Sequence, residues 1–167
     1  MKNILLLLLC TPFTVAAQKV AVNILPRVND KITWSEVFKT ASSKEQNYNM
    51  LKEWGGKMFA SPKAIQADDK AAGELAYKGY YTKTETTFVI EFTIRNRVVK
   101  AAITDFVQPV YQNGKEATLE VVEEQYVRDC RDAIPKGKEC IRPACLIGAE
   151  GIKVTFFEEI EKALSKK

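Results

Sequence analysis

Two adjacent segments with alternating side chains restrict the fold of this chain more than any other feature. In the first, residues 86–96, one face carries the apolar side chains of Phe88, Ile90, Phe92 and Ile94. The second, residues 98–108, alternates in the same way after a polar turn at Asn96. A period of two belongs to a β-strand, and two such runs joined by a short turn form an antiparallel hairpin. The sequence therefore predicts a sheet with one strongly apolar face, which helices must cover.

The other face of this hairpin is mixed and supplies the candidate binding residues. Strict alternation places Glu91 and Arg95 of the first strand on this face, together with Lys100 and Phe106 of the second. One interpretation is a surface for a ligand or partner on the open side of the sheet. The other interpretation is cross-strand charge pairing on a solvated face, which stabilises a sheet by roughly 0.2–1 kcal/mol per pair.

A helix is predicted over residues 43–59, because Tyr48, Leu51, Trp54 and Met58 recur at helical spacing. Ser42 followed by Glu45 matches a capping box at its start. The pair Gly55–Gly56 weakens such a helix by up to about 1 kcal/mol per residue. These glycines either allow a close approach to the sheet or mark early fraying of the helix.

The C-terminal half contains a second amphipathic segment, residues 151–167. Its apolar stripe consists of Phe156, Phe157, Ile160, Ala163 and Leu164. Early Glu and late Lys residues suit the helix dipole, so a helix is predicted here. Helical spacing also predicts a helix over residues 117–132, whereas residues 133–150, with two prolines and two glycines, are predicted to be a loop.

The order of predicted elements is strand, helix, four strands, an insertion over residues 109–150, and a final helix. We expect a single α+β domain over residues 31–167, preceded by a mixed lead-in over residues 18–30. A curved antiparallel sheet with two helices on one face is the simplest way to bury these apolar faces.

The first 17 residues have the layout of a secretory signal peptide. Lys2 is followed by an apolar run, and small side chains end at Ala17, which predicts cleavage between Ala17 and Gln18. The apolar run is shorter than the ~20 residues of a transmembrane helix, and no later segment is suited to span a bilayer. We therefore expect a periplasmic or secreted protein. The alternative is a lipoprotein anchored through Cys10.

Cleavage would leave three cysteines, Cys130, Cys140 and Cys145. An oxidising compartment favours a disulfide among them, and a third thiol has no partner left within the chain. The alternatives are no bond at all or a metal site. Zinc needs a fourth ligand, which would have to be Asp or Glu because the chain contains no histidine.

Several segments together resemble those of bacterial exported domains of unknown function with a TATA-binding-protein-like fold. These segments are the strand ITWSEVFK, the helix QNYNMLKEWGGKMF, the stretch DDKAAGELAYKGYY and the hairpin TTFVIEFTIRNRVVKAAITDFV. The resemblance covers roughly residues 30–108 and implies a β-α-β-β-β-β-α unit. It implies no activity and no site residues, and the cysteine-containing stretch 109–150 departs from the family pattern.

The sequence contains no recognisable catalytic constellation. Without histidine the commonest general base and the usual catalytic triads are excluded, and no phosphate-binding glycine loop is present. A net charge of +4 with well-mixed acidic residues does not indicate nucleic-acid binding. We therefore expect a non-enzymatic binding module of the bacterial cell envelope, with no cofactor and with a protein or envelope component as partner. The alternative is a periplasmic hydrolase that uses carboxylates.

Overall fold

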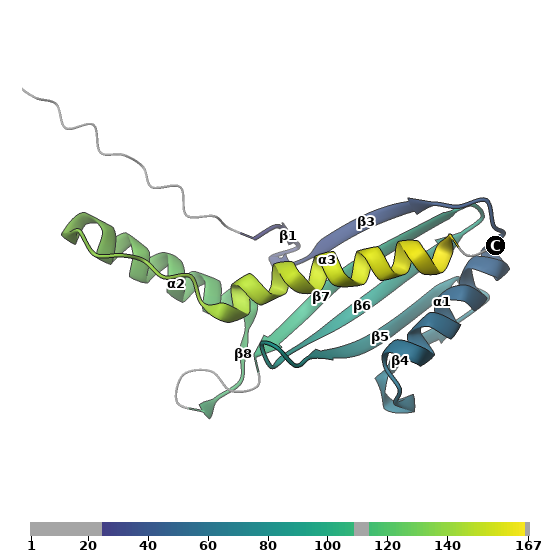
Figure 1. Ribbon diagram of the computed structural model, residues 1–167, viewed down its shortest axis with the longest axis horizontal. Coiled ribbons are helices and arrows are strands. Elements are labelled where there is room, and N and C mark those ends of the chain that lie inside the picture. Colours follow the sequence, from purple (N-terminus) through teal and green to yellow (C-terminus); the bar gives the residue numbers. More distant parts are fainter. Residues whose placement is uncertain (1–24, 109–113, 166–167) are drawn as a thin grey trace, which may run out of the picture.

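The computed structural model describes residues 25–108 and 114–165, and its main sheet is antiparallel (Figure 1). The long strands are β3 (Trp34–Lys39), β4 (Ile65–Asp69), β5 (Glu74–Tyr81), β6 (Thr86–Arg95) and β7 (Val98–Gln108). They lie in the order β3-β7-β6-β5-β4, and the short β8 (Ala117–Thr118) pairs with the end of β7. A separate hairpin precedes them, formed by β1 (Arg27–Val28) and β2 (Lys31–Ile32). The predicted α+β class and curved antiparallel sheet are confirmed.

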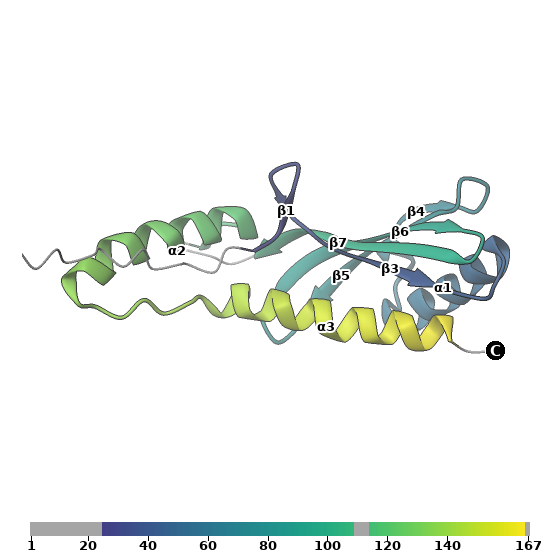
Figure 2. The same cartoon turned by 90° about the horizontal axis from the view of Figure 1, so that it is seen from above.

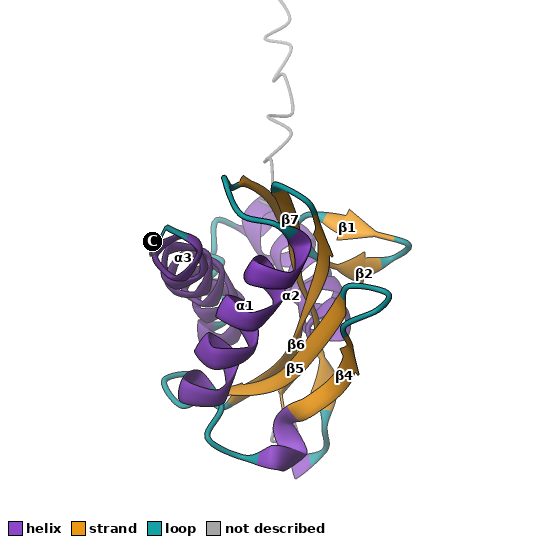
Figure 3. Ribbon diagram, turned by 90° about the vertical axis from the view of Figure 1, so that its right-hand side faces the viewer, coloured by secondary structure: helices purple, strands orange, loops and turns teal. Residues whose placement is uncertain are grey.

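The helices are α1 (Lys44–Met58), α2 (Leu119–Ala133) and α3 (Ala144–Leu164). Figure 3 shows α1 and α3 side by side on one face of the sheet, as the alternation predicts. In contrast, α2 extends away from the sheet (Figure 1), and we call residues 119–143 the arm. Single 3₁₀ turns occur at Pro62–Ala64 and Ile134–Lys136. The opposite face of the sheet carries neither α1 nor α3, and we call it the open face.

The β6–β7 hairpin has the predicted position and turn. Arg95 pairs with Val98, so Asn96 and Arg97 alone form the turn, and Arg97 has a positive φ of 61°. Four apolar side chains of β6 point toward the helices and are buried. They are Phe88, Ile90, Phe92 and Ile94.

A bulge in β7 shows that the predicted position of Phe106 on the same face as Glu91 and Lys100 is wrong. Val89 pairs with Thr104 but Thr87 pairs with Val107, so β7 has one more residue than β6 in this interval. Asp105 lies there with φ 51°. An extra residue reverses the alternation beyond it. Phe106 therefore points toward the helices, is 0% exposed, and packs edge-on against Trp34 at 5.1 Å between ring centroids.

The start of α1 differs from the prediction by one residue. Ser43, not Ser42, is the N-cap: its hydroxyl accepts a hydrogen bond from the amide of Gln46, whose side chain accepts one from the amide of Ser43. The capping box is thus Ser43–Gln46 and not Ser42–Glu45, because Gln fills the third position as well as Glu does. Met58, predicted to be in the apolar stripe, is 40% exposed at the end of the helix.

The apolar stripe of α3 begins earlier than predicted. Residues 144–150 were expected to form a loop, but they are helical, and Leu146, Ala149 and Ile152 continue the buried stripe toward the N-terminus. Glycines obscured this pattern in the sequence. Gly148 faces the side chain of Thr84 so closely that a Cβ atom would collide with it, which gives this glycine a packing role.

The arm is closed by a disulfide between Cys130 on α2 and Cys140, so a bond among the predicted cysteines is confirmed. The two residues are 10 apart in sequence, with a Cα–Cα distance of 5.2 Å. Cys145 is the free thiol; it is buried, and burial raises its pKa. The disulfide holds the chain that returns from the tip of the arm against α2.

Candidate functional site

The open face brings together three of the four predicted binding residues. Lys100 lies between Val37 of β3 and Thr93 of β6, while Glu91 lies between Ala102 of β7 and Ala76 of β5. Arg95 is at the end of β6. Glu91, Arg95 and Lys100 are all exposed. Phe106 is on the other side of the sheet.

Positive charge is concentrated at one corner of this face. Lys39 and Arg95 both pair with Val98 from opposite sides, Lys100 is two residues further along β7, and Arg97 lies in the adjoining turn. We call Lys39, Arg95, Arg97 and Lys100 the basic corner. All four are exposed, and none of the ion pairs formed within residues 25–108 and 114–165 involves them.

Sequence reasoning missed two members of the basic corner, Lys39 and Arg97. Lys39 could have been found, because the alternation in β3 places Val37 and Lys39 on the face opposite Trp34 and Phe38. Its position next to Arg95 depends on β3 pairing with β7, which is a long-range contact that the local pattern does not contain.

Small side chains line the middle of the open face. Ala67, Ala76 and Ala102 lie in one row across β4, β5 and β7, with Glu91 of β6 between them. The cross-strand neighbours of Glu91 on both sides are alanines, and Glu91 is exposed. No ion pair of Glu91 occurs in the described part of the chain.

The β1–β2 hairpin rises from the open side of the sheet (Figure 2). Its turn residues Asn29 and Asp30 both have positive φ. Lys31 binds Asp105 of the β7 bulge at 2.5 Å, and this hydrogen bond raises the pKa of Lys31. Thr33 Oγ1 and Thr104 Oγ1 are 3.2 Å apart. The bulge thus anchors the hairpin, which borders the open face opposite the basic corner.

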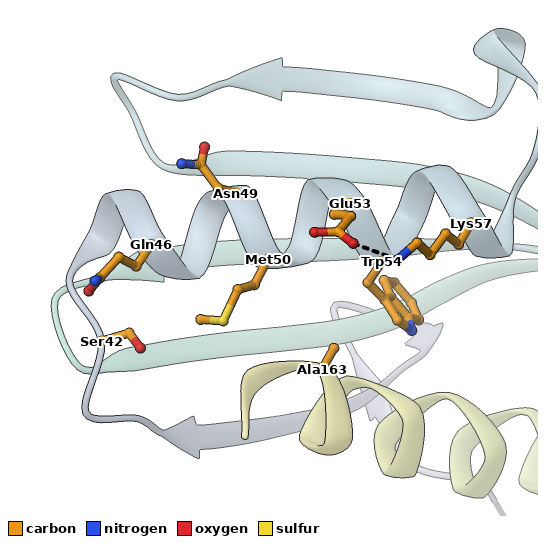
Figure 4. A pocket seen from close by; sticks show the side chains of 8 residues that line it. All are labelled: Ser42, Gln46, Asn49, Met50, Glu53, Trp54, Lys57 and Ala163. Carbon is orange, nitrogen blue, oxygen red and sulfur yellow. Dashed lines mark hydrogen bonds and ion pairs between the residues drawn. The ribbon is translucent and has the colours of Figure 1, made fainter. Parts of the chain in front are cut away.

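A groove of about 490 Å³ lies on the helical side of the sheet, along α1 and next to Ala163 of α3 (Figure 4). Trp54 and Met50 form its apolar wall, and Glu53 pairs with Lys57 at 2.5 Å on its rim. Trp54 is only 8% exposed, and its indole nitrogen has no hydrogen-bond acceptor among the described residues. The groove has a single carboxylate, which is engaged by a lysine.

A smaller hollow of about 300 Å³ at the base of the β1–β2 hairpin bears on the alternative of a carboxylate hydrolase. It is lined by Asp30, Asp105 and Glu120. Asp105 binds Lys31, and Glu120 accepts a hydrogen bond from the Ile32 amide at 2.6 Å. Two of the three carboxylates therefore hold the hairpin in place. Within the described residues, no cluster of His, Cys, Asp or Glu side chains suits a metal ion.

The predicted cleavage site at Ala17 and Gln18, and Cys10 as a lipidation site, lie outside the described residues. In the part of the chain that is described, none of the helices combines the length and apolarity needed to cross a membrane.

Comparison with solved structures identifies the fold. A DUF4468 family protein from Bacteroides ovatus superposes with a TM-score of 0.61 at 16% identity, over 86% of this chain and 91% of that one. A TBP-like protein from Parabacteroides distasonis gives a TM-score of 0.57 at 15% identity, over 85% and 98%. The fold is TATA-binding-protein-like. No family model and no curated protein matches the sequence. Identities this low establish the fold alone, since fold does not determine function.

Proposed function

We propose that this chain is an exported, non-enzymatic binding module of the bacterial cell envelope that contacts its partner through the open face. The observation that carries the proposal is the exposure of Glu91, Arg95 and Lys100 on a face that α1 and α3 do not cover. Cross-strand pairing was the competing interpretation of these charges. None of them forms an ion pair within the described residues, so neutralisation by one another does not account for them.

Two independent features support export. The first 17 residues have the charge, apolar run and small residues of a signal peptide. The Cys130–Cys140 disulfide is the kind of bond that persists in an oxidising compartment and is rare in a reducing one.

The proposal is tested by reversing the charges of Arg95 and Lys100 together. Tagged wild-type protein and the R95E/K100E variant are expressed in the native host, and the polypeptides recovered with each are quantified by mass spectrometry. The matched control is K136E/K153E, which makes the same change of charge at exposed sites on the arm and on α3. A specific partner is expected with the wild type and the control but not with R95E/K100E. Equal recovery with all three proteins would reject the open face as the contact surface.

A further inference from the structure

The outer edge of the sheet at β3 has free backbone hydrogen-bonding groups next to the basic corner. In the order β3-β7-β6-β5-β4, β3 is a terminal strand. Thr40 N donates to Arg97 O at 3.0 Å, which places the even-numbered residues of β3 in hydrogen-bonded pairs with β7. In an antiparallel pair the intervening residues direct their N–H and C=O groups away from the partner strand. Ser35, Val37 and Lys39 therefore present these groups to the outside.

A hydrogen bond at the start of the strand agrees with this geometry. Thr33, an odd-numbered residue, donates its amide to Pro26 O at 2.9 Å, on the side away from β7. The β1–β2 hairpin thus satisfies the first outward amide. From Ser35 to Lys39 the edge has no paired strand among the described residues. Such an edge can accept an added strand.

The charges beside this edge select the partner. Lys39 is on the edge strand itself, and Lys100 is one strand further in, directly opposite Val37. The nearest acidic residue in the row of Lys100 is Glu74, two strands away, which is roughly 10 Å at the usual strand spacing. Val37 adds an apolar contact, because it is 58% exposed and lies next to both lysines, opposite Lys100 and two residues before Lys39. On the open face, an incoming strand with carboxylates would meet unpaired positive charge, because the exposed Glu36 of β3 is on the opposite face.

We propose that the outer edge of β3 and the basic corner together bind an extended acidic polypeptide segment by strand addition. This inference rests on the proposed function and specifies its partner. Main-chain hydrogen bonds to Ser35, Val37 and Lys39 provide the alignment. The positive charges of Lys39 and Lys100, reinforced by Arg95 and Arg97, select carboxylates.

The test uses a capped octapeptide of alternating Glu and Val, with an otherwise identical Gln and Val peptide as control, titrated into the ¹⁵N-labelled mature protein. Binding of the Glu peptide is expected to slow hydrogen exchange of the Ser35, Val37 and Lys39 amides. The variant K39Q/K100Q is expected to weaken binding about tenfold, whereas K136Q/K153Q leaves it within about twofold. Salt near 1 M is also expected to weaken binding of the Glu peptide, because the added ions screen exposed charges.

Four results would overturn the inference. The first two are equal binding of the Gln peptide and binding without protection of these amides. The others are preferential binding of anionic phosphatidylglycerol vesicles or inorganic phosphate at the same residues, and absence of any peptide binding. If the pull-down with R95E/K100E still shows a lost partner in that case, the open face remains the contact surface and only the strand-addition mode fails.

Discussion

Gly55 and Gly56 are neighbours in α1 with opposite surroundings. A Cβ atom on Gly55 would collide with the ring of Tyr77, whereas one on Gly56 would meet nothing within 4 Å. Gly55 thus allows the close approach of α1 to β5, one of the two alternatives left open by the sequence. Burial against the helix also raises the pKa of Tyr77 to about 12.

Alanine substitutions of these two glycines are expected to have opposite effects. Gly55→Ala should lower the free energy of unfolding by about 1–3 kcal/mol through overpacking against Tyr77. Gly56→Ala should raise it by up to about 1 kcal/mol, because alanine is the better helix former. Urea unfolding of both variants measures the difference. Equal effects of the two substitutions would contradict the close packing of α1 on β5.

Asp68 joins the edge strand β4 to α1. It accepts hydrogen bonds from Lys52 at 2.7 Å and from the hydroxyl of Tyr48. The Lys52 hydrogen bond, followed by that from Tyr48, lowers the pKa of Asp68 below its ordinary value of 3.8. A carboxylate with a lowered pKa stabilises the folded state above its unfolded pKa, and this contribution is lost as the pH falls through the folded pKa.

Asp68→Asn is therefore expected to destabilise the protein by about 1 kcal/mol at neutral pH, a value kept small by the partial exposure of the pair. The difference from wild type should shrink as the pH falls below about 4. Thermal unfolding of both proteins between pH 3 and pH 7 measures it. A difference that is independent of pH would show that the charge of Asp68 is not the cause.

At the level of elements, burial stabilises the start of the arm, whereas a covalent bond holds its outer part. Its tip, around Lys136, is exposed, and α2 packs mainly through Leu119 and Val122 near its start. The disulfide closes a loop of 10 residues. In the chain-entropy model, such a bond stabilises the folded state by roughly 2–3 kcal/mol.

Replacing Cys130 and Cys140 with alanine is expected to lower the local stability of the arm by that amount and to speed hydrogen exchange in residues 134–143. Amides in the middle of β6 and β7 should keep their protection under native conditions, because their packing does not involve the disulfide. Hydrogen-exchange mass spectrometry compares the two regions. Loss of protection in β6 and β7 to the same extent would show that the arm and the sheet unfold as one unit.

How far the sequence predicts this fold depends on whether an element is defined by local periodicity. The β6–β7 hairpin and the stripe of α3 around Phe156 are local patterns, and both were predicted. The bulge at Asp105 is not local, because the extra residue only becomes visible when β7 is aligned against β6. For this reason Phe106 was assigned to the wrong face. The start of α3 was missed because Pro143 and Gly148 are typical of loops, and the packing of Gly148 against Thr84 is not visible in the sequence.

In the candidate site too, some residues are predicted by local alternation and others are placed only by strand pairing. Glu91, Arg95 and Lys100 belong to one hairpin, and strand alternation alone put them on one face. Lys39 comes from a strand that is far away in sequence, and its place in the basic corner follows only from the β3–β7 register. The free outer edge of β3 is likewise recognised only from the strand order, which local periodicity does not reveal.

For the whole molecule, the predicted signal peptide and the disulfide have a joint consequence for the native protein. Protein isolated from its own host is expected to begin at Gln18, to carry the mass deficit of a single disulfide, and to have one thiol, Cys145, that reacts only after unfolding. Intact-mass measurement with and without alkylation checks all three points. A protein that begins at Met1 with every thiol reduced would contradict export, and a lipid on Cys10 would support the lipoprotein alternative.

The role of the open face is tested most directly by photo-crosslinking in the living host. Benzoylphenylalanine replaces Thr93, which lies on that face between Lys100 and Glu74, and separately replaces the exposed Glu158 of α3. A discrete covalent adduct is predicted from position 93 and none from position 158. Adducts from position 158 alone, or from neither position, would contradict binding through the open face.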